Sequence, residues 1–156
     1  MKVTRIGMKT KGIRILDKIR TRMFDKEHRV VSVTLTDILN EIKNGNTFYW
    51  AILYLEATGN LGKGKSIFDF EEQINKSENG LNMSWNELYL LATRFYQIKD
   101  IIVTGCKDEK LLCRYENDQD MYERCDIVIN MFDACYWEIF SKMKILFTKL
   151  LKNLKK

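Results

Sequence analysis

The chain contains no proline, so its turns must be formed by glycine, asparagine and aspartate, as in Asn44-Gly45-Asn46 and Asn79-Gly80. No apolar run approaches the roughly 20 residues that a bilayer crossing needs. The N-terminus lacks the apolar stretch of about 7–15 residues that marks a signal peptide. These absences argue against a membrane or exported protein, and we expect a cytoplasmic one.

Metal-ligating and nucleophilic residues are also scarce. His28 is the only histidine, and the four cysteines (Cys106, Cys113, Cys125, Cys135) form no C-x-x-C pair. Zinc sites usually hold two ligands a few residues apart, and Ser/His or Cys/His catalysis needs a histidine base. We therefore expect no metal, no cofactor and no catalytic residue, and predict reduced cysteines buried in strands.

Charged residues are unevenly distributed along the 156 residues, with basic ends and an acidic middle. Residues 1–30 hold 10 Lys/Arg and 3 Asp/Glu, a balance of +7, and residues 142–156 hold 6 Lys and no acid, a balance of +6. Residues 31–141 hold 10 Lys/Arg against 18 Asp/Glu, a balance of −8. We expect one domain over residues 1–156, with a basic N-terminal segment, an acidic core and a basic C-terminal helix. An acidic body repels nucleic acid and attracts basic protein surfaces.

Apolar spacing predicts helices over residues 12–24 and 140–154, and a short helix near Ile38 that Thr36-Asp37 caps. Two further helices follow Ser66 and Ser84, because each hydroxyl precedes an acid by three residues. Strands are expected over residues 30–34, 48–56, 101–106, 111–115, 126–133 and 135–141. Consecutive strands after the helices predict an α+β fold, with a mainly antiparallel sheet of about 4–6 strands covered by helices.

A phosphate-binding pattern is present in Gly59-Asn-Leu-Gly-Lys-Gly64-Lys65-Ser66, between a predicted strand and a predicted helix. In such a loop the backbone and the lysine hold phosphates and the hydroxyl holds Mg²⁺. A nucleotide-binding α/β domain needs parallel strands joined by crossover helices, whereas the strands after residue 100 are joined by short loops. We favour a glycine turn whose serine caps a helix, and a P-loop enzyme stays as an alternative.

Acidic residues are densest over residues 116–126, which contain five acids and one arginine. A solvated loop between two strands is the default interpretation. The functional interpretation is a docking surface for a basic partner, with an exposed tyrosine as the aromatic anchor. The residues of this predicted surface are Glu116, Asp118, Asp120, Tyr122, Glu123 and Asp126, with Glu71 and Glu72 beside them.

Four stretches of the sequence resemble small bacterial immunity proteins. They are residues 55–75, 80–88 and 97–101, and the segment Phe132-Asp-Ala-Cys-Tyr-Trp-Glu-Ile. These proteins are the partners of toxins delivered by contact-dependent inhibition and related polymorphic toxin systems. The resemblance covers roughly residues 50–141 and rests on packing and capping patterns. It implies a non-catalytic cytoplasmic protein that binds a cognate toxin domain, often a nuclease, and covers its active site.

The basic ends leave a nucleic-acid-binding module as a further alternative, since Arg14, Arg20 and Arg22 could neutralise phosphates. The N-terminal segment has no aromatic stacking residue before Phe24 and no known nucleic-acid motif. We therefore interpret both ends as helices with solvated basic faces, and expect neither direct nucleic-acid binding nor membrane binding.

Overall fold

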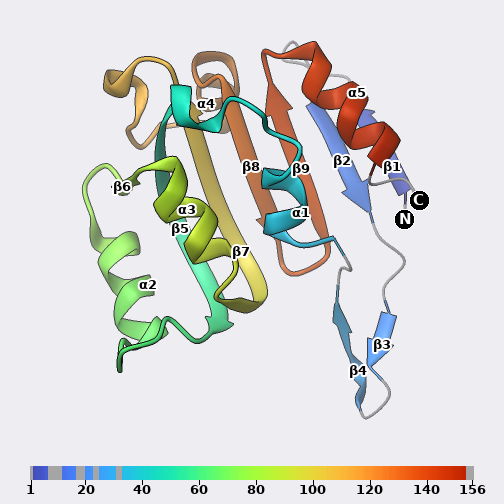
Figure 1. The fold of residues 1–156 in the computed structure, drawn as a ribbon, viewed down its shortest axis with the longest axis vertical. Coiled ribbons are helices and arrows are strands. Elements are labelled where there is room, and N and C mark those ends of the chain that lie inside the picture. Colours follow the sequence, from blue (N-terminus) through green and yellow to red (C-terminus); the bar gives the residue numbers. More distant parts are fainter. Residues whose placement is uncertain (1, 7–11, 17–19, 23–24, 31–32, 154–156) are drawn as a thin grey trace.

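The computed structural model describes residues 2–6, 12–16, 20–22, 25–30 and 33–153. Its main element is a seven-stranded sheet in which every pair of neighbours is antiparallel. In spatial order the strands are β1 (Lys2–Ile6), β2 (Gly12–Leu16), β9 (Tyr136–Ser141), β8 (Ile127–Phe132), β7 (Phe95–Cys106), β5 (Tyr49–Gly59) and β6 (Leu81–Met83). A separate two-stranded sheet joins β3 (Arg20–Arg22) to β4 (Asp25–Val30). The predicted α+β fold with an antiparallel sheet is confirmed (Figure 1).

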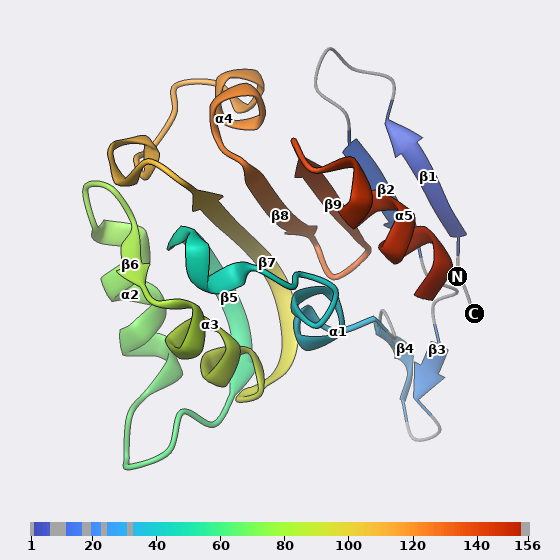
Figure 2. The ribbon, with the colours of Figure 1, turned by 45° about the horizontal axis from the view of Figure 1, so that its top comes forward.

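One face of the sheet carries the main core. Helices α1 (Leu35–Leu39), α3 (Trp85–Ala92) and α5 (Lys144–Asn153) lie over this face, with α5 above the β9 end (Figure 1, Figure 2). Successive side chains of a strand point to opposite faces, so Trp50 and Ile52 enter this core while Ala51 enters a second cluster on the other face. The fully buried residues of this core include Trp50, Ile52, Leu88, Ile129 and Ile139. Helix α2 (Ile67–Lys76) lies instead beside the edge of β5.

Helix starts follow the capping signals closely. Ser66 and Ser84 both accept the backbone N–H three residues ahead, and the carboxylate of Glu87 accepts the backbone N–H of Ser84 in return. The first helix is capped by Thr34 with Asp37, not by Thr36 as predicted, because Thr36 already lies inside the first turn. The predicted C-terminal helix begins later than expected, at residue 144, since Phe140 belongs to β9.

The predicted N-terminal helix is wrong. Residues 12–16 and 20–22 are strands, and the rest of the expected helix lies partly outside the described residues. Ile13 and Ile15 also alternate at strand spacing, and β2 pairs them with Ile139 and Trp137 on the edge of β9. Backbone pairing with that edge replaces the helical arrangement that the apolar spacing suggested. Strands β5 to β9 match the expected number, and the N-terminal segment adds β1 and β2 to the same sheet and β3 and β4 as a separate pair.

Two predictions for residues 107–126 are also wrong. The expected strand over residues 111–115 is a 3₁₀ turn, η2 (Glu109–Leu111), followed by an irregular connection. The expected solvated loop contains a helix, α4 (Asp118–Arg124), whose start is capped by the side chain of Asn117. A second 3₁₀ turn, η1 (Gly45–Thr47), precedes β5. Of the strand expected over residues 30–34, Val30 ends β4, and Val33 and Thr34 lead into α1.

Candidate functional site

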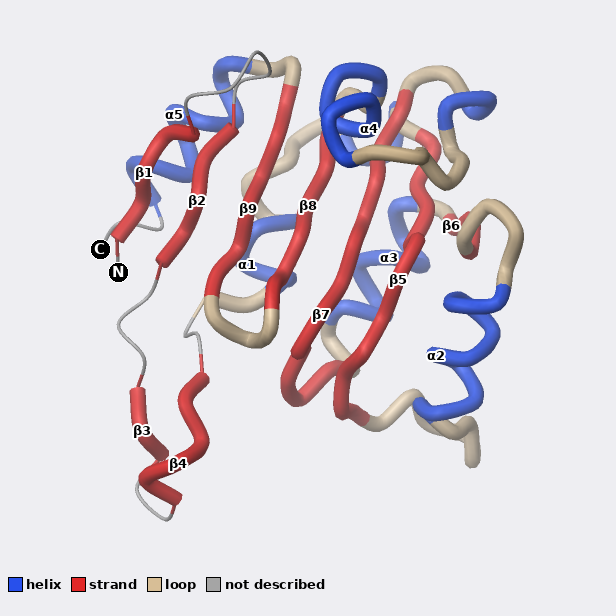
Figure 3. The backbone as a smooth tube through the Cα atoms, turned by 180° about the vertical axis from the view of Figure 1, so that it is seen from behind, coloured by secondary structure: helices blue, strands red, loops and turns tan. Residues whose placement is uncertain are grey.

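The face of the sheet opposite α1, α3 and α5, called the back face here, is only partly covered. Residues 107–126 fold over its upper half and bury a second apolar cluster that includes Leu53, Cys106, Met121, Val128 and Phe140. Below α4 no helix of the described residues lies over β5, β7, β8 and β9 (Figure 3). The lower part of the back face is therefore a candidate contact surface.

Tyr122 lies beneath α4 and is not the exposed anchor that the sequence predicted. Its ring stacks on Phe140, with centroids 3.7 Å apart and an interplanar angle of 11°, and only 6% of the residue is exposed. The side-chain amide of Asn130 donates a hydrogen bond to its hydroxyl at 3.3 Å. Burial, followed by the charges of Asp118 and Glu138, raises the pKa of Tyr122 to about 12. The prediction failed because residues 118–124 form a helix whose inward face carries Met121 and Tyr122.

The other predicted residues of this segment fall into two groups. The side chains of Asp120 and Asp126 make local hydrogen bonds, since Asp120 accepts from the side-chain amide of Asn117 and Asp126 accepts the N–H of Lys107 at 2.8 Å. Three carboxylates remain on exposed residues, and we call them the α4 rim: Glu116, Asp118 and Glu123. Glu123 also accepts from the amide of Gln119, one helical turn away.

The two predicted acids of α2 point in different directions. Glu71 accepts the backbone N–H of Ala57 at 2.7 Å and is half-buried against the edge of β5. Glu72 is exposed and pairs with Lys76 at 3.5 Å along the helix. Adjacent helical positions lie about 100° apart around the axis, so only Glu71 faces the sheet.

A shallow hollow of about 480 Å³ lies at the lower end of the back face, and we call it the carboxylate hollow. Its carboxylates come from three separate elements: Glu56 of β5, Glu71 of α2 and Asp133 of the turn between β8 and β9. Lys99 supplies the one cation of the lining, and its Nζ lies 3.3 Å from Glu56 Oε1. The hydrogen bond and the charge of Glu56 raise the pKa of Lys99. The hollow is therefore net acidic.

Aromatic residues of the back face lie beside the carboxylate hollow and, at Tyr54, between it and the α4 rim. Strand register places Tyr54 opposite Ile102, and Ile102 opposite Asn130, in one row across the back face. Tyr54 is 39% exposed, and Phe132 and Tyr136 stack with ring centroids 5.3 Å apart. Sequence reasoning missed this surface because its residues come from four strands, and only the register brings them together.

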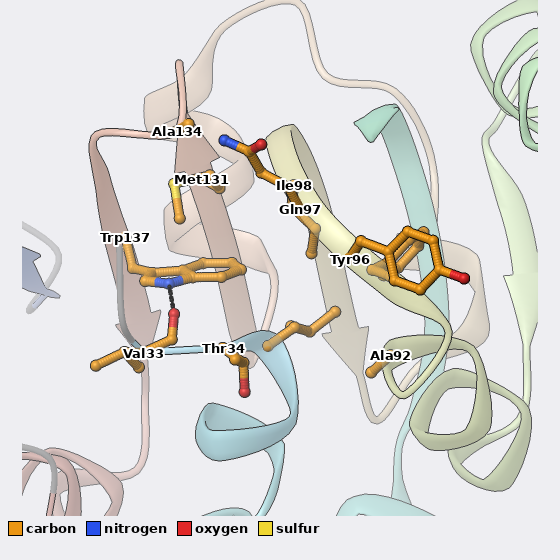
Figure 4. A pocket seen from close by; sticks show the side chains of 11 residues that line it. Val33, Thr34, Ala92, Tyr96, Gln97, Ile98, Met131, Ala134 and Trp137 are labelled. Carbon is orange, nitrogen blue, oxygen red and sulfur yellow. Dashed lines mark hydrogen bonds between the residues drawn. The ribbon is translucent and has the colours of Figure 1, made fainter. Parts of the chain in front are cut away.

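A second cavity opens on the other side of the sheet, between α1, the end of α3 and strands β7 to β9 (Figure 4). It holds only about 80 Å³, and no charged side chain lines it. The indole of Trp137 forms part of its wall and donates to the carbonyl of Val33 at 2.9 Å. Its size suits a few water molecules and not an organic substrate.

The glycine-rich segment has the strand–loop–helix order of a phosphate-binding loop, but three of its backbone N–H groups already have partners in the protein. The N–H of Asn60 donates to Arg94 O, that of Gly62 donates to Asn60 Oδ1, and that of Lys65 donates to Gly62 O. The hydroxyl of Ser66 accepts the N–H of Asp69 as a helix cap. Both neighbours of β5 are antiparallel to it, unlike the parallel sheets in which such loops bind nucleotides.

The cysteines follow the predicted reduced state, with differences in position. Cys106 ends β7 and is buried, Cys125 follows α4 and is buried, Cys113 is half-buried and Cys135 is exposed. Within the part of the chain that the structure describes, no group of three or more metal-ligating side chains occurs. Nor does any helix there combine the length and apolar character needed to cross a bilayer.

Comparison with known proteins adds no assignment. No protein-family model, curated protein or solved structure matches the chain.

Proposed function

We propose that this protein is a non-catalytic immunity protein of the cytoplasm, which binds a basic toxin domain, a nuclease by preference, and covers its active site. The observation that carries the proposal is the arrangement of the back face. Carboxylates lie at its two ends, in the α4 rim and the carboxylate hollow. Partly exposed aromatic side chains lie beside the hollow and, at Tyr54, between the two groups, on strands whose lower part no described helix covers.

Charge complementarity decides the kind of partner. Nuclease domains bind phosphates with basic clefts, and an acidic face repels nucleic acid while it attracts such a cleft. Carboxylates at the rim of an interface chiefly increase the association rate, whereas buried aromatic contacts slow dissociation. In this arrangement the α4 rim and the carboxylate hollow guide the toxin, and Tyr54, Phe132 and Tyr136 contact it.

The structure moves the proposed contact surface away from Tyr122. Tyr122, Asp120 and Asp126 support the segment that carries the rim, and Glu72 faces away from the sheet. Glu56, Asp133 and Tyr54 enter the surface in their place. The candidate toxin is the C-terminal domain encoded by the neighbouring upstream reading frame.

The experiment measures binding to that toxin domain and survival of cells that express it. Two paired variants lower the charge without changing side-chain size: Glu56→Gln with Asp133→Asn, and Glu116→Gln with Glu123→Gln. The matched control is Glu72→Gln with Glu78→Gln, two exposed acids outside both defined groups. We expect each test pair to slow association by about tenfold at low salt, and the control to leave it unchanged.

A second variant tests the centre of the face. Tyr54→Asp places a charge between the two acidic groups, and we expect faster dissociation and loss of protection in cells. Equal effects of the test and control pairs, with full protection by Tyr54→Asp, would show that another surface binds the toxin. Survival of toxin-expressing cells without this protein would reject the immunity function itself.

A further inference from the structure

Three of the four cysteines converge on one place under the segment that carries the α4 rim. Cys106 ends β7, and the register pairs the preceding Gly105 with Ile127 of β8. Cys125 lies two residues before Ile127, so the two cysteines stand at adjacent ends of neighbouring strands. Both are buried in the same apolar cluster, and each thiol is close enough to shift the pKa of the other.

A tyrosine extends this group toward the surface. The sulfur of Cys125 donates to the hydroxyl of Tyr115 at 3.9 Å, and this hydroxyl donates to Leu111 O at 2.6 Å. Cys113, which is half-buried, is also close enough to the hydroxyl to raise its pKa. Burial, with the neighbouring thiols, raises the pKa of Tyr115. Cys135, on the turn between β8 and β9, takes no part and is exposed.

These contacts make the two sulfurs unequal. The contact with Cys125, together with burial, raises the pKa of Cys106, so Cys106 keeps its proton. The same contact lowers the pKa of Cys125, and the hydroxyl of Tyr115 acts in the same direction against burial. Negative charge is therefore favoured on Cys125, and the thiolate is the reactive form of cysteine.

We propose that Cys106 and Cys125 form an oxidation site that closes into a disulfide when the protein meets a peroxide. The thiolate of Cys125 attacks one peroxide oxygen, which forms a sulfenic acid and releases hydroxide. The sulfur of Cys106 then attacks the sulfenic sulfur, so that an S–S bond forms and water leaves. In total two thiols and one hydrogen peroxide give one disulfide and two waters.

The Cys106–Cys125 disulfide would join the two ends of the segment that carries the α4 rim. Residues 106–125 contain η2, α4 and all three carboxylates of the α4 rim. A cross-link between the ends of this segment stabilises it by limiting its unfolded states. Oxidation therefore fastens the cover of the upper back face to the sheet, and this inference holds whether or not that face binds a toxin.

The test uses the full chain with Cys135→Ser, which removes the exposed thiol and keeps the three that converge. After treatment with hydrogen peroxide, peptide mapping without reduction should show a Cys106–Cys125 cross-link whose mass is lower by two hydrogen atoms. The denaturant midpoint should rise and return to its starting value after reduction with dithiothreitol. In the unmodified chain, Cys135 should react with peroxide first, because Cys106 and Cys125 become accessible only when α4 opens.

Two variants check the roles of the sulfurs. With Cys106→Ser the reaction should stop at a sulfenic acid on Cys125, which dimedone traps, whereas Cys113→Ser should still give the cross-link. A cross-link that involves Cys113, or sulfinic acid at Cys125 without any disulfide, would overturn the proposal. The mapping of the Cys135→Ser protein decides the question alone if Cys106→Ser does not fold.

Discussion

The side chain of Asn75 in α2 binds both backbone groups of Leu55 in β5. The N–H of Leu55 donates to Oδ1 at 3.0 Å, and Nδ2 donates to the carbonyl of Leu55 at 3.0 Å. This amide takes the place of a neighbouring strand, because β6 pairs with β5 only from Trp50 to Ile52. Glu71 accepts the N–H of Ala57, and Arg114 donates to the carbonyl of Leu53. An edge with free backbone groups would otherwise invite pairing with another chain.

Replacing Asn75 with alanine should therefore destabilise the protein by about 1–3 kcal/mol, since a backbone donor and acceptor lose their partners together. Asn75→Asp should be at least as harmful, because a carboxylate would face the carbonyl of Leu55. Urea denaturation measures both. Gln73→Ala, on an exposed position of the same helix, is the control and should change stability by less than about 0.5 kcal/mol.

Self-association of the protein is a second property that Asn75→Ala should change. Freed edge groups on β5 should increase concentration-dependent association, which light scattering detects. An Asn75→Ala protein as stable and as monodisperse as the Gln73→Ala protein would show that the amide does not protect the strand.

Tyr122 predicts a stability change at alkaline pH. Its pKa is raised to about 12 in the folded protein, whereas a free tyrosine titrates near 10. Between pH values of about 10 and about 12, Tyr122 of the unfolded chain loses its proton while Tyr122 of the folded protein keeps it. The stabilisation that comes from the protonated hydroxyl is therefore complete below about pH 10 and is lost as pH rises toward about 12. Tyr122→Phe should remove this part of the pH dependence.

At neutral pH the same variant should cost about 0.5–1.5 kcal/mol, because the amide of Asn130 loses its acceptor. Tyr122→Ala should cost about 3–5 kcal/mol, since it also leaves a cavity beside Phe140. Unfolding midpoints at about pH 7 and about pH 11 give both effects, with the exposed Tyr96→Phe as the control. Equal pH dependence of Tyr122→Phe and the unmodified chain would contradict the buried placement.

Much of the fold could be predicted because its signals are local. Ser84 and Glu87 form a capping box that depends only on their spacing in the sequence. The run from Phe48 to Glu56 is apolar enough to form a largely buried strand. The N-terminal segment differs because Ile13 and Ile15 fit a helix and a strand equally well. The edge of β9, more than 100 residues away, decides between them.

The candidate surface could not be predicted for a related reason. Acid density over residues 116–126 is visible in the sequence, but whether Tyr122 points outward depends on the helix phase and on the presence of Phe140 below it. Glu56 and Asp133 are isolated acids in the sequence, and the turn between β8 and β9 brings them to one hollow. Local patterns therefore predicted the acids of the α4 rim and Glu71, and missed Glu56 and Asp133.

The turn that borders the carboxylate hollow is strained. Asp133 and Ala134 both have positive φ, 46° and 56°, a region that costs an alanine roughly 1–2 kcal/mol. Hydrogen bonds hold the turn in this shape, since Ala134 N–H donates to Lys99 O and Asp133 N–H donates to Asp100 Oδ1. Ala134→Gly should therefore stabilise the protein by about 0.5–1 kcal/mol.

Thermal denaturation checks this prediction, and Ala92→Gly is the matched control. Ala92 lies in the last turn of α3 with helical geometry, so the same substitution there should destabilise by about 1 kcal/mol. A loss of stability in Ala134→Gly similar to that in Ala92→Gly would mean that the turn carries no strain.

Substitutions in the loop at residues 59–66 distinguish a phosphate-binding loop from a simple turn. Lys65 is exposed, and the N–H groups of Gly62 and Lys65 already have partners inside the loop. Lys65→Ala should leave stability within about 0.5 kcal/mol of the unmodified chain.

Gly64→Ala should destabilise the protein by about 1 kcal/mol, because its φ of +69° disfavours a side chain although nothing lies within 4 Å of the added Cβ. Calorimetry with ATP and Mg²⁺ should show no binding to either variant or to the unmodified chain. Binding that Lys65→Ala abolishes would mean instead that the loop rearranges around a nucleotide, and it would restore the enzymatic alternative.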